Sequence, residues 1–156
     1  MSSEELYNKI GASSDLFESE LKQSFQETVC NEDGEMLEYL VYSLFLCESA
    51  INLSNYNGIL NKLIVSTWHE QHENIAMLLQ KFKSPTSVDV LYETATKEFK
   101  YLEYDEAYAL AVKCIWALGD IGTEQAKEQL ELLLNSSNHI IKENAQKQID
   151  RIKSKM

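Results

Sequence analysis

The stretch ALGDIGTEQA, at residues 117–126, decides the fold class of this chain. It joins two segments whose apolar residues recur at helical spacing, so it predicts a tight turn between two antiparallel helices. We expect Gly119 to supply the left-handed residue that ends the first helix. Ile121 would fill the apex of the hairpin, Gly122 would turn the chain again, and Thr123 would cap the second helix.

The segments around this turn repeat a spacing of small and apolar residues. Two helices match at a constant offset of 34 residues: Ala107, Ala111, Ile115 and Leu118 against Ile141, Ala145, Ile149 and Ile152. A second stripe matches at an offset of 51 residues: Ile75, Leu79 and Phe82 against Ala126, Leu130 and Leu133. Alternation of two helix types predicts stacked helical hairpins, in which each unit buries its apolar face only against its neighbours.

The Ala-Leu-Gly-x-Ile-Gly core of the turn resembles the hairpin turn of HEAT-like repeats, the short class also seen in phycobilisome-lyase-type proteins. The resemblance covers roughly residues 104–153. Residues 55–83 look like a degenerate earlier unit, and residues 84–103 look like an insertion in the array. The resemblance implies the fold and a tendency to bind partners. It implies no chemistry, because such repeats carry many functions.

The remainder of the chain is also predicted to be helical. One proline and five glycines in 156 residues leave little material for a turn-rich β fold. We therefore predict an all-α, HEAT-like superhelix of about eight helices in a single domain, 1–156. Residues 1–53 would form acidic N-terminal helices, either a cap or divergent repeats, and residues 54–156 the HEAT-like repeats. The helix at about 35–50 is apolar nearly all round, so we expect it to be central.

Charge and hydropathy exclude several classes of function. The chain has 25 acidic and 14 basic residues, a net charge of −11, whereas nucleic-acid phosphates and anionic membranes require clustered Lys and Arg. The start of the chain, Met1–Glu5, lacks the features of a secretory leader, and the most apolar stretch, Met36–Ile51, is too short for a membrane span. Three cysteines without close spacing are expected to be reduced and buried. We expect a cytoplasmic protein.

No constellation of residues predicts catalysis, a metal or a cofactor. His69 and His72 lie three residues apart, one short of the zincin spacing, and His139 is distant in sequence. We expect the first two to be solvated or capping residues near Trp68. Both tryptophans, Trp68 and Trp116, are expected in the core. The chain has no nucleophile turn and no glycine-rich phosphate loop, so we expect no enzyme.

Two sets of residues are candidates for binding a partner. The first is acidic: Glu18, Glu20, Glu27, Glu32, Asp33, Glu35 and Glu38. The second interleaves aromatic rings and carboxylates: Tyr101, Glu103, Tyr104, Asp105 and Tyr108, whose tyrosines would share one helical face. Solvated helix faces and buried packing of the rings are the alternatives. Residues 1–78 carry a net charge of −10 and residues 79–156 only −1.

These observations predict a non-catalytic protein-binding module whose acidic surface steers a basic protein partner. The most concrete form is an immunity or antitoxin-type inhibitor that occludes a basic toxin such as a nuclease. The alternatives are a lyase or nucleic-acid enzyme built on helical repeats, and a structural subunit of a larger assembly. The identity of the partner and the oligomeric state are left open.

Overall fold

The computed structural model describes residue 2 and residues 14–155 of the chain; most of Met1–Glu5 therefore lies outside the described residues. The described part is all-α, as predicted, and contains no strand. Its α-helices are α2 (Ser14–Asn31), α3 (Gly34–Leu46), α4 (Asn57–Ile64), α5 (His72–Phe82), α6 (Val88–Thr96), α7 (Ala109–Ile121), α8 (Glu124–Leu133) and α9 (His139–Ser154). Three short 3-10 helices are η1 (Leu53–Tyr56), η2 (Pro85–Ser87) and η3 (Lys100–Leu102).

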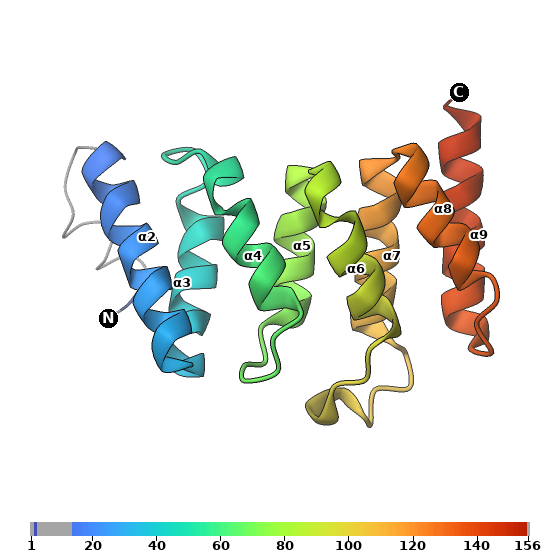
Figure 1. The fold of residues 1–156 in the computed structure, drawn as a ribbon, viewed down its shortest axis with the longest axis horizontal. Helices are drawn as coiled ribbons and strands as arrows, with labels where there is room; N and C mark the ends of the chain where they lie inside the picture. The colour runs from blue at the N-terminus through green and yellow to red at the C-terminus, as the bar shows by residue number, and fades with distance from the viewer. Residues whose placement is uncertain (1, 3–13, 156) are drawn as a thin grey trace.

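The helices follow one another along the long axis of the molecule, from α2 at one end to α9 at the other (Figure 1). They form two layers of alternating helices. In one layer α3 packs against α5, α5 against α7, and α7 against α9; in the other α4 packs against α6 and α6 against α8. Sequential hairpins α2–α3, α4–α5, α6–α7 and α8–α9 therefore stack side by side, and each is covered mainly by its neighbours.

A single apolar core runs between the two layers. The buried side chains form one connected cluster from Phe17 in α2 to Ile152 in α9. Each fully buried leucine or isoleucine in this cluster stabilises the fold by about 1.5–3 kcal/mol relative to exposure. The stripe Ile141, Ala145, Ile149 and Ile152 is buried throughout, as its spacing predicts.

The turn at residues 117–126 joins α7 to α8, but it differs from expectation at one residue. Gly119 lies inside α7, and it is Gly122 that has the left-handed conformation, with φ of +65°. The prediction for Gly119 was wrong because α7 continues for one more turn. Thr123 caps α8 as predicted, since its side chain accepts a hydrogen bond from the Ala126 N–H at 3.1 Å.

Three features of the proposed repeat are corrected by the structure. Ala107 precedes α7 and is exposed, so the matched stripe begins at Ala111. α5 lies in the layer of α7 and α9, so its match to α8 was wrong. The reason is that an apolar stripe shows that a helix is buried on one side but does not show to which layer it belongs. Residues 84–103 are no insertion, because they contain α6, which occupies a regular place between α4 and α8. The irregular part is the long α6–α7 connection, residues 97–108.

Several side chains are more exposed than predicted. α3 was expected to be central, but one of its sides faces solvent: Tyr42 is 58% exposed and Leu46 is 53% exposed. Trp116 is exposed, whereas Trp68 packs partly buried against the core. All three cysteines are free thiols; Cys47 and Cys114 are buried, and Cys30 is exposed. No helix within the described residues has the length and apolarity required to cross a membrane.

Candidate partner-binding surfaces

The exposed side of α3 combines aromatic, aliphatic and acidic side chains. Asp33 starts this helix by accepting a hydrogen bond from the Met36 N–H at 3.0 Å. Helical spacing then places five exposed residues on one side, opposite the buried stripe of the same helix. We define this α3 face as Glu35, Glu38, Tyr39, Tyr42 and Leu46.

The α3 face differs from the rest of its layer because its carboxylates form no ion pair among the described residues. Ion pairs hold α5, α7 and α9 to their neighbours. Lys81 Nζ of α5 lies 2.9 Å from Glu48 Oε2 in the turn after α3, Lys113 Nζ of α7 lies 3.0 Å from Glu73 Oε1 of α5, and Arg151 Nη2 of α9 lies 2.9 Å from Asp120 Oδ1 of α7. Within the part of the chain that the structure describes, Glu35 and Glu38 form no ion pair. Both carboxylates belong to exposed residues.

The other acidic candidates do not join this surface. Glu18 accepts a hydrogen bond from the Asn52 N–H at 3.1 Å, and so ties α2 to the loop after α3. Glu27 accepts one from Gln23 on the same helix, and Glu20 is exposed on α2. Glu32 lies in the α2–α3 turn with φ of +49°. The predicted acidic set is thus divided between α2, the α2–α3 turn, the N-cap of α3 and the α3 face.

The segment 101–108 is not a helix, so the prediction that its tyrosines share one face was wrong. Tyr101 belongs to η3, Tyr104 is 88% exposed in the following turn, and Tyr108 directly precedes α7 in a left-handed conformation, with φ of +53°. The physical reason is Asp105, whose carboxylate accepts hydrogen bonds from the N–H groups of Ala107 and Ala109, each at 3.0 Å. The bond from Ala107 closes the turn before α7, and the bond from Ala109 satisfies one of the free donors at the start of the helix.

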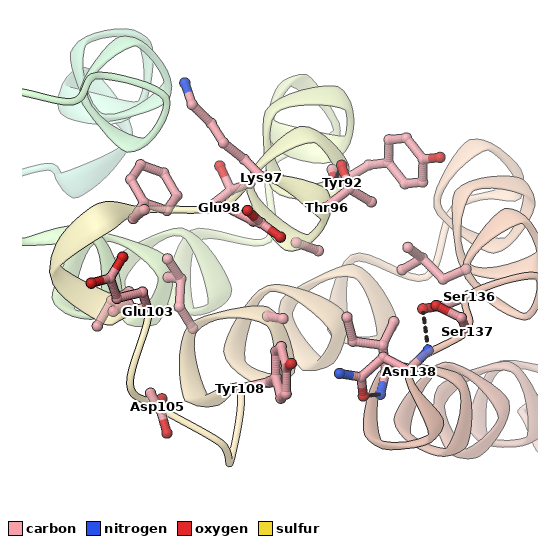
Figure 2. A pocket seen from close by; sticks show the side chains of 18 of the residues that line it. Tyr92, Thr96, Lys97, Glu98, Glu103, Asp105, Tyr108, Ser136, Ser137 and Asn138 are labelled. Carbon is pink, nitrogen blue, oxygen red and sulfur yellow. Dashed lines mark hydrogen bonds between the residues drawn. The ribbon is translucent and has the colours of Figure 1, made fainter.

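Three of the predicted residues in this segment line a pocket of about 960 Å³ at one edge of the molecule. Glu103, Asp105 and Tyr108 lie on the α6–α7 connection, and the opposite wall is the α8–α9 loop with Ser136, Ser137 and Asn138 (Figure 2). The floor is apolar and comes from α7, α8 and α9: Leu110, Ala111, Leu133 and Ile141. We call this feature the edge pocket.

The histidine pair is buried, so the solvated alternative of the prediction is wrong, whereas His69 does bond the N–H of Gln71 at the start of α5. His69 is only 3% exposed and His72 has no exposed area, and their rings stack with centroids 4.2 Å apart. In His69, Nε2 donates to the Leu63 carbonyl oxygen at 2.7 Å and Nδ1 accepts from the Gln71 N–H at 2.9 Å. Burial lowers the pKa of His69, so the ring is held neutral.

His72 ties the α4–α5 loop to the α6–α7 connection. Its Nε2 lies 2.6 Å from the Ser66 carbonyl oxygen, which only accepts, so Nε2 carries the proton and Nδ1 accepts from the Tyr101 hydroxyl at 2.7 Å. Burial lowers the pKa of His72 to about 4, and the charge of Lys97 acts in the same direction. Burial raises the pKa of Tyr101 to about 12, which keeps its donor proton in place. All four ring nitrogens are engaged within the protein, and among the described residues no group of three metal-ligating side chains is assembled.

Sequence reasoning missed both the edge pocket and the buried histidine pair. The pocket depends on where two long connections lie relative to each other, and no local spacing encodes this. The histidines stood beside Trp68 in an otherwise polar run, which concealed their burial. Comparison with family models, with curated proteins and with solved structures finds no match for this chain.

Proposed function

We propose that this chain is a non-catalytic protein-binding module, built as a HEAT-like array, that holds a basic protein partner on the α3 face. Its most concrete form is an immunity or antitoxin-type inhibitor that occludes a basic toxin. The observation that carries the proposal is the coincidence, on one side of one helix, of Tyr39, Tyr42 and Leu46 with two carboxylates that have no ion pair among the described residues.

The two kinds of side chain have separate roles in such an interface. Tyrosine supplies large apolar area together with a polar tip, so Tyr42 and its neighbours would form the desolvated centre of the contact. Glu35 and Glu38 would raise the rate of association with a positively charged surface and reject acidic competitors. Ten of the eleven net negative charges lie in residues 1–78, so the long-range field also favours approach of a basic protein to this half.

Affinity capture from the native cell tests the proposal, with charge-reversal variants as comparison. The wild-type chain is expected to retain a basic protein, identified by mass spectrometry, and the double variant E35K/E38K is expected to lose it. Asp33 is left unchanged because its carboxylate caps α3. The matched control, E128K/D150K, changes the net charge equally at exposed positions on α8 and α9 and should retain the protein. Equal retention by both variants, or capture of no basic protein by the wild type, would contradict the proposal.

A further inference from the structure

The edge pocket has the size and floor of a binding site for a short extended segment. Its volume of about 960 Å³ lies at the upper end of the range of roughly 300–1,000 Å³ that small-ligand sites occupy. Apolar side chains from three helices, including Leu110, Leu133 and Ile141, form its base. A partner that fills it therefore needs apolar side chains as well as polar ones.

Two of the charged residues that line the pocket already form hydrogen bonds within the protein. Lys97 donates to the Val65 carbonyl oxygen at 2.9 Å, and its ammonium lies 5.5 Å from the centre of the Phe99 ring. Figure 2 shows this side chain directed away from the pocket. Asp105 accepts hydrogen bonds from the backbone N–H groups of Ala107, before α7, and Ala109, its first residue.

The charges that remain favour a cation. Glu98 and Glu103 are exposed, line the same wall, and form no ion pair within the described ranges. Lys100 is the one other charged side chain in the lining. The uncommitted groups thus carry a net negative charge, which complements a positively charged side chain.

Tyr108 adds an aromatic ring to the lining of the same pocket. Its left-handed backbone, unusual for a bulky residue, is held by the hydrogen bonds of Asp105 on either side and directs the ring to the pocket (Figure 2). A guanidinium can stack on a tyrosine ring while its planar edge binds a carboxylate through two hydrogen bonds, which an ammonium cannot do.

We infer that the edge pocket binds a peptide segment of a protein partner in which arginine alternates with apolar residues. The guanidinium lies against Tyr108 and pairs with Glu98 or Glu103, and the flanking apolar side chains cover the floor formed by α7, α8 and α9. This is a second interaction site, on residues separate from the α3 face, and it goes beyond the proposed function.

Titration of the full chain with an acetylated, amidated Leu-Arg-Leu-Arg-Leu peptide, followed by ¹⁵N NMR, tests the inference. We expect saturable binding, with shift changes concentrated in residues 97–108 and 134–141. The variant E98Q/E103Q should weaken binding at least tenfold, and so should replacement of arginine by its neutral isostere citrulline in the peptide. Absence of saturation, shifts elsewhere, or unchanged affinity in E98Q/E103Q would overturn it.

One control separates this inference from the proposed function. The variant E35K/E38K, which removes charges from the α3 face alone, should bind the peptide as the wild type does. If it binds the peptide as weakly as E98Q/E103Q, the peptide reports only the general acidity of the chain and the edge pocket is not its site. Loss of the captured basic protein in E35K/E38K with unchanged peptide binding would support both sites independently.

Discussion

Gly119 lies in the interior of α7, where the side chain of Gln148 from α9 occupies the space that a Cβ would take. Gln148 is fully buried and bonded to Arg151, so it cannot swing away freely. Alanine favours a helix over glycine by about 1 kcal/mol, but overpacking a buried contact costs about 1–3 kcal/mol. We predict that G119A lowers the free energy of unfolding in urea by about 1 kcal/mol.

The matched control for this variant is Gly58, which also lies in a helix but has no neighbouring atom within 4 Å of the place that a Cβ would take. There only the conformational effect remains, so G58A should raise the free energy of unfolding by up to about 1 kcal/mol. If G119A stabilised the protein as G58A does, the close approach of α7 and α9 would not depend on glycine.

The buried histidine pair predicts a specific dependence of stability on pH. The pKa of His72 is 6.5 when unperturbed and about 4 in the folded protein, so the unfolded chain takes up a proton first as the pH falls. The stability that the neutral ring contributes is present above pH 6.5 and is lost progressively toward pH 4. Between pH 7.5 and pH 5 the loss should be about 2 kcal/mol.

Urea unfolding at the two pH values measures this contribution by difference. The stacked ring of His69 is also held neutral by burial, which lowers its pKa, so it adds to the pH dependence of the wild type. The variant H72Q should therefore lose about 2 kcal/mol less than the wild type over this range. The exposed residue His139 serves as the control, and H139Q should follow the wild type. An identical pH dependence in H72Q would show that His72 is not held neutral.

At the scale of the elements, Asp120 joins three helices of one layer. It accepts hydrogen bonds from Gln80 of α5 at 2.7 Å and from Arg151 of α9 at 2.9 Å, while Arg151 lies 5.1 Å from the centre of the Trp116 ring. Burial opposes the charged form of Asp120, but the two hydrogen bonds and the charge of Arg151 outweigh it and lower the carboxyl pKa.

We predict that D120N destabilises the fold by about 1 kcal/mol, a value reduced for the partial exposure of Arg151. A double-mutant cycle with R151Q should give a coupling of at least about 0.5 kcal/mol. The exposed pair Glu143–Lys147 within α9 is the comparison, and E143Q should cost less than about 0.5 kcal/mol. Additive effects of D120N and R151Q would show that the tie between α7 and α9 contributes nothing.

The helices themselves could largely be predicted from apolar spacing, while their ends and connections could not. The stripe Ile141, Ala145, Ile149 and Ile152 lies on α9, His139–Ser154, because the stripe is regular and Asn138 caps the helix. The helix whose stripe was expected to include Ala107 instead begins at Ala109. Tyr101, Tyr104 and Tyr108 have helical spacing by coincidence, and the competing hydrogen bonds of Asp105 decide the backbone there.

The candidate site was predictable only in part for the same reason. A helical pattern locates Glu35, Glu38 and Tyr42 on α3, but solvent exposure depends on which helices cover α3. The edge pocket is formed by two connections that are distant in sequence, and their approach follows from tertiary packing. The burial of His72 likewise follows from Phe99 and Tyr101, which the α6–α7 connection supplies.

Over the whole molecule, the ion pairs divide the chain into two electrostatic halves. Every ion pair among the described residues takes its basic member from residues 81–151, and none of these pairs involves Glu18, Glu20, Glu27, Glu35 or Glu38. The net charge has the same division, since residues 1–78 carry −10 and residues 79–156 carry −1. A long-range field of this kind acts on the rate of association and weakens with added salt.

The most direct test of the central claim is the association rate constant between this chain and the basic protein that affinity capture is expected to retain, measured at increasing salt concentration. If the α3 face steers the partner, E35K/E38K should lower the rate at least tenfold at low salt, and the difference should close as salt rises. Equal association rates for the wild type and E35K/E38K at low salt would contradict the account.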